Sequence, residues 1–147
     1  MRNNFSKILS GIVTSKLSGG KQGDFLNREI KIDKENYTYQ IYIPPNVQAN
    51  ETPLMIFLHG IRERGSGGYI SGMFSSVIKQ YLKDIPAIIM FPQCRPNVYW
   101  SDPLMDKMVM CQVESVSNEF SVDEKRKYLV GVSMGGYGVV NVVGGGY

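Results

Sequence analysis

Residue types that mark several protein classes are scarce in this sequence of 147 residues, which contains one histidine and two cysteines. Cys94 and Cys111 are too few for a small disulfide framework, and two free thiols are expected instead. No Cys-x-x-Cys pair and no Cys/His cluster is present, so no metal site is predicted. No stretch approaches the roughly 18 apolar residues that a membrane span needs, so no membrane partner is predicted.

An excess of charge of one sign is also lacking, because the net charge is +3 and charged residues make up 20% of the sequence. The densest basic group, residues 125–127, directly follows two acidic residues. That arrangement is typical of a solvated helix end or loop. The composition therefore gives no indication of a nucleic-acid partner or of an acidic one.

The hydrophobic share of 43% is sufficient for one domain with a real core. We expect residues 1–24 to form a flexible lead-in and residues 25–147 to form part of a single α/β domain. Arg2 and Lys7 could begin a signal peptide, but the apolar stretch at 8–13 is brief and no Ala-x-Ala site follows it. A cytoplasmic location is expected, with secretion as the alternative.

The order of predicted elements defines the fold class. Apolar runs and β-branched residues predict strands, and helical spacing of apolar residues predicts helices. The predicted strands cover residues 28–32, 37–43, 53–58, 87–91 and 128–132, and the predicted helices cover 71–83 and 101–119. A hairpin connection at 33–36 joins the first two strands. The later alternation of strands and helices predicts a three-layer α/β fold with a mostly parallel sheet.

One motif contains a candidate catalytic serine. Gly131-Val132-Ser133-Met134-Gly135 matches G-x-S-x-G, which places a serine on a sharp turn between a strand and a helix. Ser133 is the candidate nucleophile, and the backbone N–H of Met134 is a candidate oxyanion donor. The alternatives are a glycine-rich turn with an incidental serine and a phosphate-binding turn, although neither common phosphate motif fits.

A second motif lies at the end of the third predicted strand. The backbone after this strand is the usual source of the other oxyanion N–H, and we assign that role to Ile61, with His59 and Gly60 supporting the loop. The alternative is a strand end that is closed by a tight turn.

The sequence resembles the α/β-hydrolase superfamily, and within it the esterases related to polyhydroxybutyrate depolymerases, feruloyl and acetylxylan esterases and the so-called predicted peptidases. The resemblance covers about residues 25–137. It is carried by segments 25–28, 39–44, 57–60, 62–65, 91–94, 99–103 and 128–138. It implies a serine esterase that uses no cofactor, with a small-molecule or glycan-linked ester as substrate.

The sequence departs from that family at the catalytic triad. The family's triad runs Ser, then Asp or Glu, then His, but residues 134–147 contain no acid and no histidine. His59 lies on a different strand and is not expected to act as the base, and Asp102 and Asp106 are expected to be capping and surface residues. We therefore expect the N-terminal part of a longer esterase, with the C-terminal strands missing. A natural truncation is the alternative.

Three functions remain open at this point. The first is a serine carboxylic-ester hydrolase that works through an acyl-enzyme, with this chain alone expected to be inactive. The second is a non-catalytic remnant that binds a ligand or partner. The third is an acyltransferase or serine peptidase on the same fold. Tyr99 and Trp100 either line the substrate site or pack the loop over the sheet, and no oligomeric state is predicted.

Overall fold

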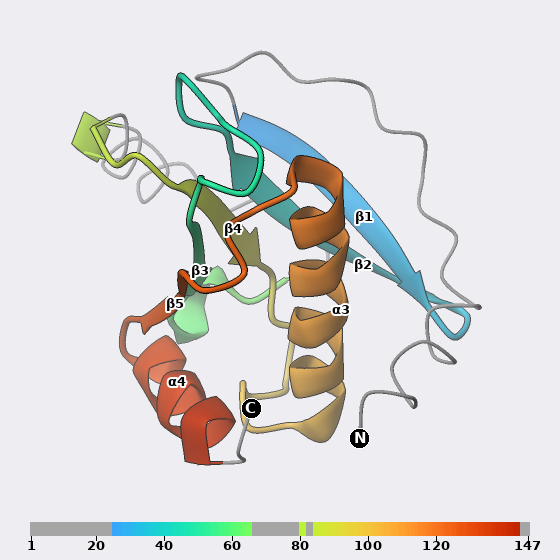
Figure 1. Cartoon of the computed structure of the whole chain (residues 1–147). Coiled ribbons are helices and arrows are strands. Elements are labelled where there is room, and N and C mark those ends of the chain that lie inside the picture. Colours follow the sequence, from blue (N-terminus) through green and yellow to red (C-terminus); the bar gives the residue numbers. More distant parts are fainter. Residues whose placement is uncertain (1–24, 66–79, 82–83, 145–147) are drawn as a thin grey trace.

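The computed structural model describes residues 25–65, 80–81 and 84–144. Within them lies a five-stranded sheet in the order β1-β2-β4-β3-β5, accompanied by two long helices (Figure 1). The elements in chain order are β1 (Phe25–Ile32), β2 (Glu35–Tyr42), β3 (Leu54–Leu58), the 3₁₀ turn η1 (Ile61–Glu63), β4 (Ile88–Pro92), α3 (Pro103–Phe120), β5 (Lys127–Gly131) and α4 (Met134–Gly144). The five predicted strands are therefore present, with ends that shift by at most a few residues.

The sheet is mixed: a mostly parallel sheet that opens with an antiparallel hairpin was predicted, and one further antiparallel pair is present. β3 pairs in parallel with β4 and with β5, but β1–β2 and β2–β4 are antiparallel. The hairpin is also tighter than the predicted connection, because Glu35 already pairs with Ile32 and the turn consists of Asp33 and Lys34. Asp33 adopts a φ of 56°, a left-handed conformation that Asp tolerates better than most residues.

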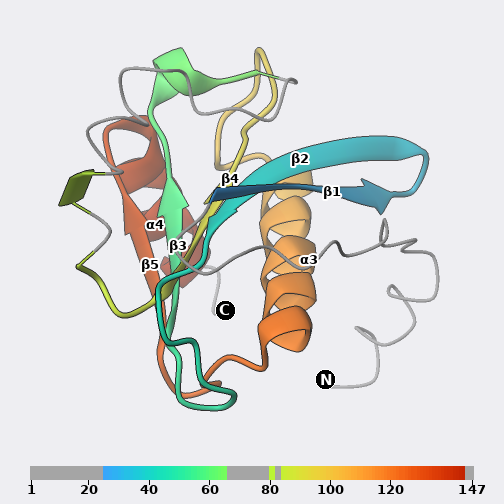
Figure 2. The same cartoon turned by 90° about the horizontal axis from the view of Figure 1, so that it is seen from above.

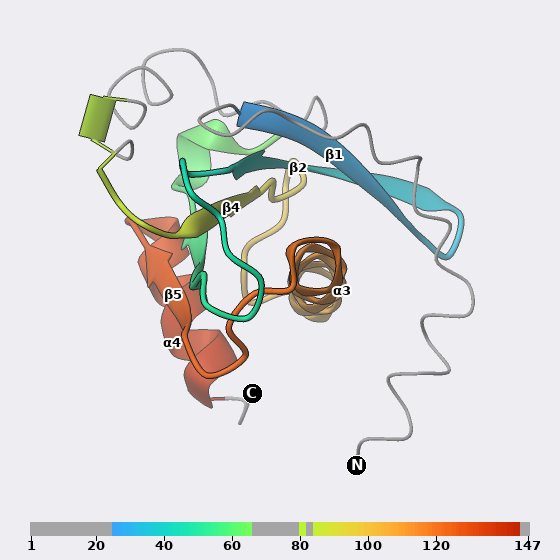
Figure 3. The same ribbon diagram turned by 45° about the horizontal axis from the view of Figure 1, so that its top comes forward.

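Both helices pack on one face of the sheet. α3 begins where the sequence predicted: the side chain of Asp102 accepts a hydrogen bond from the N–H of Leu104 at 2.8 Å, and Pro103 occupies the first turn. The helix ends at Ser121, whose φ of 47° stops the helical path. Figure 2 shows the β1–β2 hairpin crossing over α3, and Figure 3 looks nearly along the axis of α3.

The main core lies between these helices and the sheet. It joins side chains from all five strands and both helices, with Ile41, Leu54, Leu58, Ile88 and Met108 fully buried. A smaller apolar cluster occupies the opposite face, around Tyr42, Ile89 and Phe91. The helix predicted over 71–83 lies outside the described residues except for 80–81, as does the whole of the predicted lead-in at 1–24. No helix in the described part of the chain is long and apolar enough to cross a membrane.

Candidate active site

Ser133 stands on the turn that links the carboxyl end of β5 to the start of α4. Its φ is 53°, a left-handed conformation that costs free energy for any residue with a Cβ. The turn is held by the surrounding backbone, because the N–H of Val132 donates to Leu58 O at 3.2 Å and the N–H of Gly136 donates to Ser133 O at 2.9 Å. The side chain of Ser133 is exposed. A strained serine on a strand–helix turn is the geometry that the motif predicted.

The glycines on either side of the serine are required by close backbone contacts. A Cβ on Gly131 would overlap the backbone of Gly135, and a Cβ on Gly135 would overlap the carbonyl of Leu58. Gly136 differs, because a Cβ there would meet only Gly131 O at 3.8 Å. The G-x-S-x-G spacing therefore lets α4 start directly against the end of β3.

His59 is a fully buried structural residue at the end of β3. Its Nε2 accepts a hydrogen bond from the N–H of Cys94 at 3.0 Å, so Nδ1 carries the proton and donates to Gly60 O at 2.7 Å. Burial lowers the pKa of His59 below its usual range, which favours this neutral form. Since both ring nitrogens are occupied, His59 cannot serve as the base for Ser133, in agreement with the sequence-based expectation.

The loop after β4 is fastened to the loop after β3 by two further side chains. The indole of Trp100 packs edge-on against the His59 ring at 5.0 Å, and its Nε1 donates to His59 O at 2.9 Å. Arg64 donates to Ile61 O at 3.2 Å and to Val98 O at 2.9 Å. The sequence did not reveal this role of Arg64, because its acceptors are backbone carbonyls that leave no pattern in the side chains.

Two backbone N–H groups are available next to Ser133. Met134 is the first residue of α4, and the N–H groups of a first helical turn have no acceptor within the helix. Ile61 is the first residue of η1, and within the described part of the chain its N–H has no acceptor either. The α4 N-terminus adds a partial positive charge beside Ser133. An anion that develops at this point would be stabilised by both effects.

A pocket of about 400 Å³ opens beside Ser133. It is lined by Ile61, Tyr99, Trp100, Ser101, Ser133, Met134, Tyr137 and Gly138. Trp100 is 2% exposed whereas Tyr99 is 55% exposed, so Trp100 forms part of the core and Tyr99 faces the opening. Both residues line the pocket, and Trp100 also has the packing role that was considered for them. Tyr137, which was not singled out from the sequence, is 82% exposed on the first turn of α4.

Three other titratable groups near the site do not take part in it. Asp102 caps α3, and Asp106 accepts a hydrogen bond from Asn141 Nδ2 at 3.2 Å. Burial raises the pKa of Asp106. Burial also raises the pKa of the Cys94 thiol to about 11, so this thiol is not a nucleophile at neutral pH. Within the described residues, no group of three or more His, Cys, Asp or Glu side chains could hold a metal ion.

Comparison with solved structures identifies the fold. No protein-family model matches the chain, and no curated protein matches it. Among solved structures, it matches a thermostable esterase at 30% identity and a TM-score of 0.69, over 82% of this chain and 37% of that one. It matches a thermostable esterase from Pseudomonas putida at 24% identity and a TM-score of 0.55, over 81% of this chain and 37% of that one. It also matches a lipase/esterase from Lactobacillus plantarum at 18% identity and a TM-score of 0.62, over 82% of this chain and 49% of that one.

The chain has an α/β-hydrolase fold like that of these esterases. It spans between 37% and 49% of the length of the three structures named above, and thus corresponds to part of their fold.

Proposed function

We propose that this chain contributes the nucleophile and the oxyanion hole of a serine carboxylic-ester hydrolase. The proposal rests on the position of Ser133, which is exposed at the N-terminus of a helix and has a φ of 53°. The similarity to esterases, at 30% identity in one case, supports ester hydrolysis as the reaction. No step of this reaction calls for a cofactor, because the serine oxygen forms the covalent intermediate.

The proposed reaction has two steps. Ser133 Oγ loses its proton to a base and attacks the ester carbonyl carbon, and the carbonyl oxygen becomes an oxyanion. The N–H groups of Ile61 and Met134 donate to this oxyanion. The carbon–oxygen bond to the alcohol then breaks, the alcohol leaves with a proton, and an acyl-enzyme remains. Water hydrolyses the acyl-enzyme and restores Ser133.

The base for this reaction is not a histidine of the described chain. The sequence has one histidine, His59, and both of its ring nitrogens form hydrogen bonds within the core. We propose that a group outside these 147 residues supplies the base. In subtilisin, loss of the catalytic histidine costs about a factor of 10⁶ in kcat, so turnover by this chain alone is expected to be very slow.

A fluorophosphonate probe tests the nucleophile directly, because it reacts covalently with an activated serine. We expect slow labelling of the chain at Ser133, located by mass spectrometry of the digested protein. Ser133→Ala should abolish this labelling. Ser101→Ala, which changes another serine of the same pocket, should retain it. Labelling that persists in Ser133→Ala would refute the assignment.

A second candidate is a chain that binds esters without reacting with them. It is favoured by one observation, the engagement of the only histidine in the core. An absence of labelling in the wild-type chain, together with saturable binding of an ester, would support this candidate over the first.

A further inference from the structure

Glu63 is the acidic residue that lies beside Ser133. A methyl group on Gly60 Cα would lie 3.1 Å from Glu63 Oε2 and 3.7 Å from Ser133 Cβ, so both side chains border the same small space. The backbone of Glu63 is fixed there, because its N–H donates to Gly60 O at 3.3 Å and its carbonyl accepts from Gln93 Nε2 at 3.2 Å. The side chain therefore folds back over Gly60, which Ser133 also borders.

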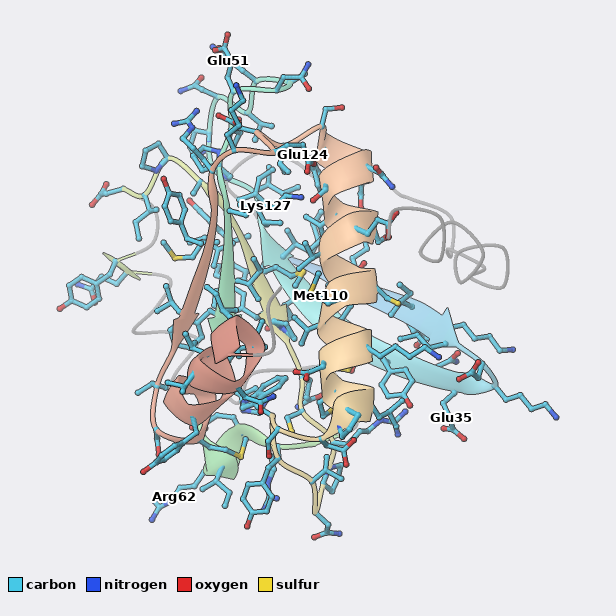
Figure 4. All side chains as sticks on the ribbon, turned by 60° about the horizontal axis from the view of Figure 1, so that its bottom comes forward. Glu35, Glu51, Arg62, Met110, Glu124 and Lys127 are labelled. Atoms are coloured by element: carbon cyan, nitrogen blue, oxygen red, sulfur yellow. The ribbon has the colours of Figure 1, made fainter. Side chains whose placement is uncertain are left out.

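Within the described part of the chain, the carboxylate of Glu63 interacts with another side chain only through its charge, which acts on the nearby His59 ring. Among the described residues, its side-chain oxygens form no hydrogen bond or ion pair, and the residue is half-buried. Neither neighbouring arginine neutralises it: Arg64 binds backbone carbonyls and stacks over the Tyr99 ring at 5.4 Å. Arg62 extends outward at the end of the molecule opposite Glu51 and Glu124 (Figure 4). A negative charge is thus left next to the proposed nucleophile.

Ser133 has two different neighbours: an apolar pocket and the acidic side chain of Glu63. The pocket of about 400 Å³ is mostly apolar and aromatic, and its lining includes neither Gly60 nor Glu63. The carboxylate is therefore not part of the pocket wall. A negative charge beside an oxyanion hole disfavours the developing oxyanion, since like charges repel. The negative charge of Glu63 favours binding when the substrate carries a positive charge that pairs with the carboxylate.

We propose that Glu63 is a specificity-determining residue that selects esters carrying a cationic group on the arm bound outside the apolar pocket. The inference rests on the proposed function of Ser133, because it concerns the substrate of that site. The short, apolar arm of such an ester would occupy the pocket. An ammonium on the other arm would donate hydrogen bonds to the Glu63 carboxylate.

Binding of two matched esters tests the inference without any reaction at Ser133. 5-Aminopentyl butyrate and hexyl butyrate have nearly the same shape, but the first ends in an ammonium and the second in a methyl group. Their dissociation constants would be measured by NMR titration of the 147-residue chain. Glu63→Gln should weaken binding of the ammonium ester by about 5-fold, the order expected for one partly solvated charge pair, and leave hexyl butyrate unchanged. Added salt should reduce the difference.

Glu51→Gln is the matched control, because it removes the same charge at the opposite end of the molecule (Figure 4). It should change neither dissociation constant. Equal binding of the ammonium ester by wild type and Glu63→Gln would overturn the inference, and so would an equal loss for both esters, which would indicate a structural effect. Each of these results is separate from the fluorophosphonate test, so Ser133 can remain the nucleophile if the role of Glu63 fails.

Discussion

The indole N–H of Trp100 donates a hydrogen bond to the backbone carbonyl of His59 at 2.9 Å, and this bond joins the loops that follow β3 and β4. His59 is followed by Gly60 and Ile61, so the bond acts two residues before the proposed oxyanion donor. Trp100 also lines the pocket beside Ser133. One side chain therefore fixes both the wall of the pocket and the backbone that would bind the oxyanion.

Trp100→Phe tests this connection. A six-membered ring is kept, but the five-membered ring and its N–H are lost, which leaves a gap in the core and the buried His59 carbonyl without this donor. The lost donor alone costs about 1–3 kcal/mol, and the gap adds to it. We expect the free energy of unfolding, measured in urea, to fall by at least that amount. Fluorophosphonate labelling of Ser133 should slow as well. An unchanged labelling rate in a destabilised variant would show that the bond supports the fold but does not position the oxyanion donor.

The pH dependence of stability should reveal the buried His59. Burial holds its pKa in the folded chain below the value of about 6.5 expected in the unfolded chain. As the pH falls below 6.5, the unfolded chain binds a proton that the folded chain does not bind. The free energy of unfolding should therefore decrease from pH 7 toward pH 5, by up to about 1.4 kcal/mol per pH unit.

His59→Gln provides the control for that experiment, because His59 is the only histidine in the sequence. The variant should be less stable at pH 7 but should lose the slope between pH 7 and pH 5. Asp106, whose raised pKa acts in the opposite direction, is present in both proteins and cancels in the difference. The same slope in both proteins would contradict a buried neutral histidine.

The features that the sequence predicted are those that depend on neighbouring residues. Asp102 and Pro103 start α3 because capping involves only the first turn of the helix. The turn at Ser133 follows from two glycines within a span of five residues. The pairing of β2 with β4 was not predictable, because it joins residues about fifty positions apart and leaves no periodic signal in either strand. The place of Glu63 beside Ser133 depends in the same way on how β3 and β5 lie in the sheet.

The requirement for glycine at position 135 can be tested against its neighbour. Gly135→Ala would drive a Cβ into the backbone carbonyl of Leu58, and backbone cannot move aside cheaply. We expect a loss of more than about 3 kcal/mol in the free energy of unfolding, or failure to fold, because the clash falls in the core. Gly136→Ala meets only Gly131 O, at an ordinary contact distance of 3.8 Å, and should be neutral or stabilising by up to about 1 kcal/mol, since alanine favours helix. Equal effects of the two substitutions in urea unfolding would show that α4 does not approach β3 as described.

The ion pair of Arg28 and Glu119 connects β1 to α3 away from the active site. Its atoms lie 2.9 Å apart, and the two side chains are 9% and 11% exposed. Arg28→Met would leave the Glu119 carboxylate buried without this partner, and breaking such a pair costs about 3–5 kcal/mol. The double variant Arg28→Met/Glu119→Leu removes both charges, so it should recover most of that loss. Urea unfolding of the three proteins measures both effects. A double variant as unstable as Arg28→Met would show that packing of the arginine stem, and not the buried charge, accounts for the loss.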